Sequence, residues 1–320
     1  MILVENLTKA FGPKTAVNGV SFQVERGEVL GFLGPNGAGK STTMRMITGY
    51  IPATAGRAVV CGFDVAEQPL EAKRRIGYLP ESAPSYPEMT VAAFLGFAAE
   101  MRGLRGADKK KAVHRVVETC GLDSVLHQTI DTLSKGFRHR TCLAQALIHD
   151  PDVLIMDEPT DGLDPNQKHE VRMLIRRMGE RKAIVFSTHI LEEVEAACTR
   201  AIIIDRGAIV ANGTPEELKA RSDRAGAVLM TVRSPSAAAV AEAVGRLPTV
   251  SRCEVLSEEP NRAVIRVYPD KSRADGAFTA QVTEEVLERW TIVQLRTEEG
   301  RLDDVFRGLT RPDTAPEARP

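Results

Sequence analysis

The sequence has almost no net charge and no long hydrophobic run. Its 320 residues carry a formal net charge of −1, which argues against the strongly basic face that broad nucleic-acid binding needs. We therefore expect no nucleic-acid partner. No apolar stretch approaches the ~20 residues that a membrane-spanning helix requires, so any association with a membrane is expected to depend on another protein.

Cysteines are few and widely separated, and none has the spacing of a CxxC motif or a Cys/His metal site. This pattern predicts reduced, mostly packed thiols and a cytoplasmic compartment. The first residues, MILVENLTKAFG, lack the charged-then-apolar order of a signal peptide, which agrees with that expectation. The five cysteines are Cys61, Cys120, Cys142, Cys198 and Cys253.

The first part of the chain alternates short β-branched runs with amphipathic stretches, which is typical of an α/β domain. We place this domain at residues 1–221, with a helical part at about 85–150. The predicted strands are 2–7, 19–24, 28–34, 56–62, 153–157, 183–188 and 201–207, and the predicted helices are 41–50, 91–101, 109–121 and 165–180.

The composition changes at a short polar stretch, residues 222–226, which is the predicted linker. Residues 227–310 then follow the order strand, helix, strand, strand, helix, strand and a last helix. That order predicts a small α+β domain of the βαββαβ type, for which no catalytic constellation is evident. The Pro-rich tail, residues 311–320, is predicted to be disordered.

The strongest local motif is GPNGAGKST, which follows a strand-like run and opens a helix-like one. It fits the P-loop pattern, in which glycines let backbone N–H groups point at phosphates and a helix N-terminus adds positive potential. Lys40 would neutralise β- and γ-phosphate charge, and Ser41 would coordinate Mg²⁺. The phosphate-binding candidates are Gly34, Pro35, Asn36, Gly37, Ala38, Gly39, Lys40, Ser41 and Thr42.

An acidic pair ends the apolar run VLIMDE. Asp157 would then lie at the carboxyl edge of a sheet, where α/β folds bind ligands, and would hold Mg²⁺. Glu158 could act as the general base that polarises an attacking water. Such a pair is often only a solvated turn, but the upstream P-loop favours the functional interpretation.

These two motifs also occur in kinases and GTPases. Three other motifs distinguish between these classes of protein. LSKGFRHR at 133–140 resembles the signature of ABC ATPases, PTDGLDP at 159–165 is similar to their D-loop, and FSTHILEE contains His189 where the family has its switch histidine. The resemblance covers about residues 2–220. The wording of YLPE and LSKG resembles the bacterial drug- and gliding-type exporter branch.

The resemblance implies roles for matching positions. Phe11 corresponds to the aromatic residue that stacks on adenine, although a lone aromatic is more often a core residue. Ser134 and Gly136 would contact the γ-phosphate of ATP bound to an opposite subunit, and Asp164 would link the two sites. His189 would touch the γ-phosphate and support the water that Glu158 activates.

Two departures from the family pattern stand out. Glu81 occupies the position where most members carry the Q-loop glutamine, and a carboxylate there can still reach Mg²⁺ or water. In the signature, Lys135 and Phe137 replace a glycine and a glutamine, while Gly136 is kept because close approach to phosphate tolerates no Cβ. Lys135 either adds positive charge near the opposite nucleotide or faces solvent.

The expected fold is therefore an α/β P-loop NTPase of the ABC type with a helical signature subdomain, followed by the small α+β domain. The implied function is an ATP-binding and ATP-hydrolysing subunit, with ATP and Mg²⁺ as cofactors, that powers a separate membrane permease, in the direction of export. It would act as a homodimer or as a dimer with a similar subunit, at the cytoplasmic face of the inner membrane. The alternatives are a non-transport ABC ATPase of DNA repair or translation and a P-loop kinase. The sequence does not identify the cargo.

Overall fold

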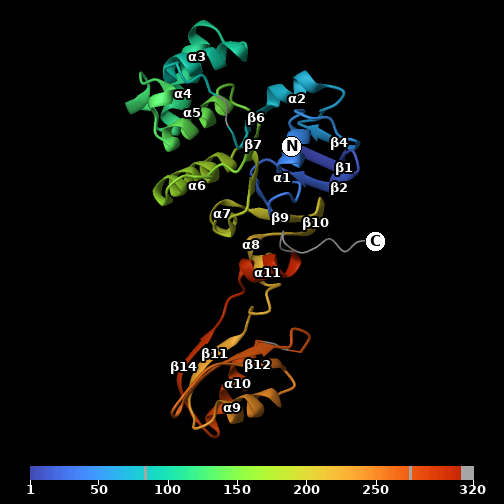
Figure 1. Ribbon diagram of the computed structural model, residues 1–320, viewed down its shortest axis with the longest axis vertical. Coiled ribbons are helices and arrows are strands. Elements are labelled where there is room, and N and C mark those ends of the chain that lie inside the picture. Colours follow the sequence, from blue (N-terminus) through green and yellow to red (C-terminus); the bar gives the residue numbers. More distant parts are fainter. Residues whose placement is uncertain (83–84, 274–275, 311–320) are drawn as a thin grey trace. The chain divides into compact units, whose positions relative to one another are not determined.

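The computed structural model describes residues 1–82, 85–273 and 276–310 (Figure 1). The chain forms two compact units that divide between Pro215 and Glu216, and the second unit runs to Gly308. The predicted linker, residues 222–226, lies inside this second unit, where the Ser222 hydroxyl donates to Asp304 Oδ2 at 3.1 Å. The predicted disordered tail lies outside the described residues.

The first unit contains an antiparallel sheet and a mostly parallel sheet. The antiparallel sheet has the order β2-β1-β4-β5 and the larger one β10-β9-β3-β8-β7-β6, in which β10 alone runs antiparallel to its neighbour. The strands are β1 (Ile2–Phe11), β2 (Lys14–Val24), β3 (Val29–Leu33), β4 (Ala55–Val60), β5 (Phe63–Asp64), β6 (Ile76–Leu79), β7 (Val153–Asp157), β8 (Ala183–Thr188), β9 (Arg200–Asp205) and β10 (Ala208–Gly213).

The parallel strands form because they are short β-branched runs that helices cover. Every residue of β3, β7 and β8 is buried, as expected for strands that bury both faces. Each large apolar side chain removed from water contributes about 1.5–3 kcal/mol, which is the main stabilising force here. The helices of this unit nearest the sheets are α1 (Lys40–Ile47), α2 (Pro69–Arg75), α6 (Pro165–Gly179) and α7 (Leu191–Ala197).

Three further helices of the first unit lie together (green in Figure 1), and their apolar core continues onto strands of the parallel sheet. They share one apolar core, which includes Phe94, Leu95, Val116 and Leu143. This is the expected helical subdomain, and the fold of the unit is the α/β P-loop architecture. Its elements are α3 (Val91–Met101), α4 (Gly106–Cys120), the short 3₁₀ turns η1 (Asp123–Val125) and η2 (Ile130–Thr132), and α5 (Lys135–Leu147).

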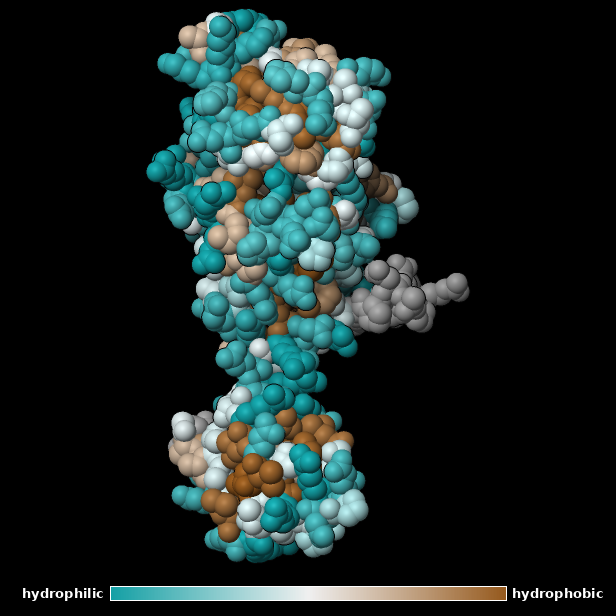
Figure 2. Space-filling view, turned by 90° about the vertical axis from the view of Figure 1, so that its left-hand side faces the viewer, coloured by the Kyte–Doolittle hydropathy of each residue, from teal (hydrophilic) through white to brown (hydrophobic). Residues whose placement is uncertain are grey.

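The second unit has the predicted βαββαβ order, with a last helix. Its antiparallel sheet has the strand order β12-β13-β11-β14, and a core of its own lies between the sheet and two helices. Apolar side chains also reach the surface of this unit among hydrophilic ones (Figure 2). The elements are α8 (Pro215–Lys219), β11 (Val228–Arg233), α9 (Ala237–Gly245), β12 (Val250–Glu259), β13 (Arg262–Pro269), α10 (Phe278–Leu287), β14 (Thr291–Thr297) and α11 (Leu302–Leu309).

Candidate nucleotide site

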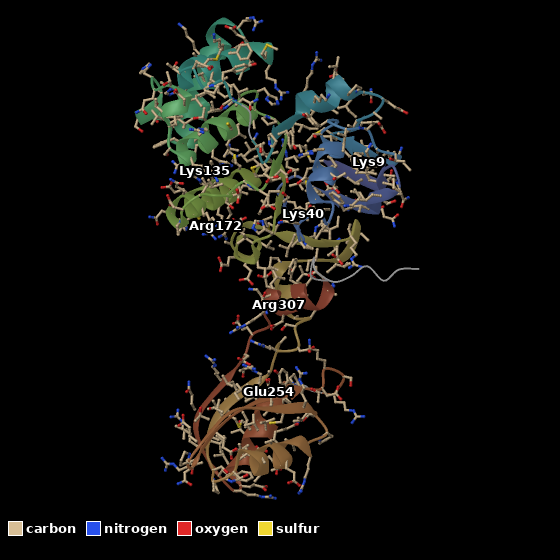
Figure 3. All side chains as sticks on the ribbon, in the orientation of Figure 1. Lys9, Lys40, Lys135, Arg172, Glu254 and Arg307 are labelled. Atoms are coloured by element: carbon tan, nitrogen blue, oxygen red, sulfur yellow. The ribbon has the colours of Figure 1, made fainter. Side chains whose placement is uncertain are left out.

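The P-loop joins β3 to α1. Gly39 is the N-cap of α1 with φ 106°, and a Cβ at this position would lie 2.6 Å from the Ala16 carbonyl oxygen, so only glycine fits. The side chain of Lys40, which is labelled in Figure 3, is 6% exposed, and its Nζ donates to the carbonyls of Gly34 at 2.8 Å and Pro35 at 3.1 Å. The carbonyl groups of the loop thus hold its own lysine in place.

Asp157 ends β7 and is 1% exposed. Its Oδ1 accepts from Ser41 Oγ at 3.0 Å and from Ser187 Oγ at 2.5 Å. The other oxygen, Oδ2, is buried, and no described residue hydrogen-bonds to it. A buried carboxylate oxygen without a partner, beside a serine hydroxyl at a helix N-terminus, suits a hard cation such as Mg²⁺.

Glu158 follows in a strained backbone conformation. Its φ of 49° lies in the left-handed region, which is uncommon for a residue other than glycine, asparagine or aspartate. The Glu158 N–H donates to Ser187 Oγ at 3.0 Å, which fixes this conformation. The carboxylate lies 3.6 Å from Lys40 Nζ through Oε1 and 2.9 Å from His189 Nδ1 through Oε2.

A cavity of about 560 Å³ opens at this edge of the sheet. It brings together P-loop residues with the predicted catalytic residues Glu81, Glu158 and His189, which come from three separate parts of the sequence. Gly34, Pro35 and Ala38 of the predicted loop are not among its lining residues. The described residues that line it are Asn36, Gly37, Gly39, Lys40, Ser41, Thr42, Glu81, Glu158, Asp161 and His189.

The signature residues lie on other elements and do not line this cavity. Ser134 is the N-cap of α5, and its Oγ accepts from the Phe137 N–H at 3.3 Å. Gly136 is buried, and an added Cβ would lie 2.5 Å from the Gln167 side chain on α6. Asp164 caps α6 by accepting from the Gln167 N–H at 2.9 Å. The N-termini of α5 and α6 therefore lie side by side and form one surface next to the cavity-lining loops.

Two residues have surroundings that the sequence did not indicate. Lys135, labelled in Figure 3, begins α5 with 64% of its side chain exposed, and its Nζ forms an ion pair with Asp161 at 3.8 Å. Phe11 ends β1 with 51% of its surface exposed, beneath Lys9 Nζ at 5.1 Å from the ring centroid. Phe11 is therefore an exposed aromatic in a cation–π contact and not a core residue.

Ser187 is a site residue that the sequence analysis missed, as is Asp161, which lines the cavity. Ser187 pairs with Asp157 in the parallel register of β7 and β8, and its hydroxyl contacts both acidic residues of the strand end. Its position two residues before His189, at the end of a buried strand, is the only signal in the sequence. The neighbour of a strand is unknown until the sheet order is known.

The site combines a phosphate-binding loop, an acidic strand end and a cavity lined mainly by polar and charged residues. This combination defines the class of P-loop nucleotide hydrolases. The family model described as ABC transporter matches residues 17–161. The chain is 34% identical over 311 residues to the linearmycin resistance ATP-binding protein LnrL of Bacillus subtilis (strain 168), a match that covers 97% of this chain and 98% of that protein.

Two further matches agree. A probable multidrug ABC transporter ATP-binding protein, YbhF of Escherichia coli (strain K12), is 41% identical over 223 residues, which are 69% of this chain and 38% of that protein. A solved structure described as the ATP binding subunit of an ABC transporter is 30% identical, with a TM-score of 0.63 over 68% of this chain and 92% of that one. The chain belongs to the ABC transporter family and is an ATP-binding, ATP-hydrolysing subunit of a transporter. No helix in the described parts of the chain is long and apolar enough to cross a membrane.

Proposed function

We propose that this subunit works as half of a head-to-tail dimer that traps two ATP molecules and drives a separate membrane permease. The observation that supports the dimer is the separation of two phosphate-binding surfaces. The cavity holds the P-loop and Glu158, whereas Ser134 and Gly136 lie on the N-terminus of α5 and do not line it. A second copy would supply these residues to each site, with Asp164 close to both.

Residues that line the cavity and residues outside its lining, among them Phe11 and Asp157, have complementary tasks toward ATP. Backbone N–H groups from Asn36 to Thr42 bind the phosphates at the N-terminus of α1, and Phe11 stacks on adenine. Ser41, Asp157 and Glu81 would hold Mg²⁺, which supplies charge neutralisation at the β- and γ-phosphates. The partnerless Oδ2 of Asp157 supports that assignment.

Hydrolysis starts from the pair Glu158 and His189. Glu158 accepts a proton from water as general base, and its carboxylate is aimed by the strained φ of 49°. His189, at 2.9 Å, orients that carboxylate and contacts the γ-phosphate. Lys40 exchanges its carbonyl partners for phosphate oxygens. Loss of the γ-phosphate removes the bridge between the two subunits, and the dimer opens.

The permease contact is assigned to a hollow of about 380 Å³ on the helical subdomain. Its rim holds Tyr86, which is 51% exposed and stacks edge-on against Phe97 at 5.6 Å between ring centroids. An aromatic hollow of this kind suits a short helix from a membrane protein. With this contact the subunit would work at the cytoplasmic face of the inner membrane. The names of the linearmycin resistance and multidrug relatives support export as the direction.

The dimer is tested with Glu158→Gln, which keeps the shape of the site but removes the base. With saturating Mg-ATP, light scattering should show the 34.9 kDa chain shifting to the mass of a dimer. The control is Glu158→Gln combined with Lys40→Ala, which should stay monomeric because it cannot hold the triphosphate. A Glu158→Gln protein that stays monomeric at saturating Mg-ATP would reject the sandwich.

A further inference from the structure

A buried carboxylate lies beneath the catalytic strand ends. Glu193, on α7, is 1% exposed, and its carboxylate accepts hydrogen bonds from two threonine hydroxyls. Thr188 Oγ1 donates to Oε2 at 2.7 Å, and Thr160 Oγ1 donates to Oε1. Both threonines are themselves buried, with 0% and 2% of their surfaces exposed.

This arrangement is costly for stability alone. A carboxylate removed from water loses its hydration, and the two donors that replace it are neutral hydroxyls. Apolar residues of similar volume often stabilise such positions as well or better. The remainder of the buried face of α7, Val194 and Ala197, is in fact apolar. The presence of Glu193 therefore calls for a role beyond packing.

The two donors lie next to the residues with proposed catalytic roles, one in the loop after β7 and one at the end of β8. Thr160 lies two residues after Glu158, and Thr188 immediately precedes His189. Thr188 Oγ1 also accepts from the Ile190 N–H at 3.0 Å, so one hydroxyl fixes the chain on both sides of His189. A single carboxylate thus links the loop after β7 to the last residue of β8.

We propose that Glu193 is a positioning residue, which sets the distance between His189 and Glu158 by holding Thr188 and Thr160 together. The inference rests on the proposed roles of Glu158 and His189. Glu193 is too deeply buried to meet ATP, so it acts only through these neighbours. Because Thr160 and Asp164 share one short loop, the same link connects the surface offered to the second subunit with the switch histidine.

The central experiment is the steady-state ATPase of Glu193→Ala and Glu193→Gln, with nucleotide affinity measured in parallel. Loss of the link should lower kcat by about tenfold or more in Glu193→Ala and change the Kd for nucleotide by less than about threefold. Glu193→Gln should recover kcat to within about threefold of wild type, because its amide can accept from one threonine hydroxyl and donate to the other. Glu192→Ala, at an exposed position of the same helix, is the matched control and should stay within about twofold of wild type.

A double-mutant cycle separates positioning from general destabilisation. Thr160→Val should also lower kcat, but combining it with Glu193→Ala should lower kcat no further than Glu193→Ala alone, because both remove the same link. Additive losses, equal losses of kcat and nucleotide binding, or a Gln variant no better than Ala would each overturn the inference. Glu158→Gln is measured alongside these variants. If it hydrolyses ATP like wild type, the proposed mechanism fails. If Glu158→Gln is inactive but Glu193→Ala has normal turnover, only the inference about Glu193 is rejected.

Discussion

At the scale of single residues, His189 is defined by one contact. Its Nδ1 lies 2.9 Å from Glu158 Oε2, while nearly half of the side chain (47%) remains exposed to the cavity. A side chain placed in this way can orient the base on one side and meet phosphate on the other. We expect it to contribute little to nucleotide binding.

Replacing this histidine should therefore affect hydrolysis more than binding. In His189→Ala we expect kcat to fall about 100-fold, the usual contribution of a group that assists proton transfer. The Kd for ATP should change by less than about threefold, because the P-loop is intact. His169→Ala, an exposed histidine on α6, is the control. Equal losses of kcat and affinity would assign His189 to binding.

Two other histidines make the stability of the first unit depend on pH. Burial lowers the pKa of His149 to about 4, with the charge of Arg102 acting in the same direction, and burial likewise lowers the pKa of His139 to about 4. The unfolded chain takes up a proton on each near pH 6.5, whereas the folded chain does so only near pH 4. The two histidines therefore do not lower the free energy of unfolding above pH 6.5, and they lower it progressively as the pH drops toward 4.

The test is denaturant unfolding of wild type and His149→Leu across this pH range. Each histidine can contribute a slope of at most about 1.4 kcal/mol per pH unit, so the variant should show a shallower decline than wild type. The variant also loses the contact of Nε2 with the Ile76 carbonyl at 3.1 Å, which lowers stability at every pH but leaves the slope comparison valid. Identical slopes would show that His149 does not contribute.

At the scale of elements, two serine N-caps offer a matched comparison. Ser134 caps α5 and Ser236 caps α9, and each hydroxyl accepts one backbone N–H at 3.3 Å. Only Ser134 has a proposed contact with ATP on an opposite subunit. The local energetics of the two caps are otherwise alike.

Both Ser134→Ala and Ser236→Ala should lower the free energy of unfolding by about 1 kcal/mol, the usual value of an N-cap. ATP turnover should fall by about tenfold or more in Ser134→Ala alone. Comparing phosphate release with chemical denaturation separates the two effects. Turnover that falls equally in both variants, or in neither, would remove Ser134 from the nucleotide site.

Much of the architecture was predictable because local signals agree with the fold. The buried strands β7 and β8 are β-branched or apolar runs, and GPNGAGKST contains its own turn chemistry at Gly39. The order of the strands in the sheets and the hydrogen-bond partners of buried polar side chains could not be predicted. Glu193 stands in HILEEVE among glutamates that resemble solvated helix residues, and only its spacing from Ala197 places it on the buried side. Ser187 has the same problem, since its partner Asp157 is thirty positions away in the chain.

At the scale of the whole molecule, the two units have separate apolar cores. The core clusters of the first unit and that of the second share no residue. The second unit also contains a buried ion pair, in which Arg266 Nε lies 2.5 Å from Glu298 Oε2 and the side chains are 12% and 8% exposed. Its stability can therefore be changed without altering the nucleotide site.

We expect Arg266→Met to destabilise the second unit by about 3 kcal/mol, because Glu298 remains buried without its partner. This should lower the melting temperature of that unit by about 10 °C or more and leave nucleotide affinity within about twofold of wild type. Arg307→Met, which removes an exposed ion pair with Asp303 in the same unit, is the control and should shift melting little. The test is calorimetry with and without ATP. If both units melted in a single transition that shifted as a whole, their stabilities would not be separate and the prediction would be wrong.

The left-handed backbone of Glu158 has a consequence for how this chain can change over time. Glycine at this position would relieve the backbone strain and stabilise the fold, yet it would remove the carboxylate that we propose accepts the proton of the attacking water. Selection for robustness and selection for catalysis therefore pull in opposite directions at one residue. A lineage that no longer needed to hydrolyse ATP would be free to lose this glutamate first.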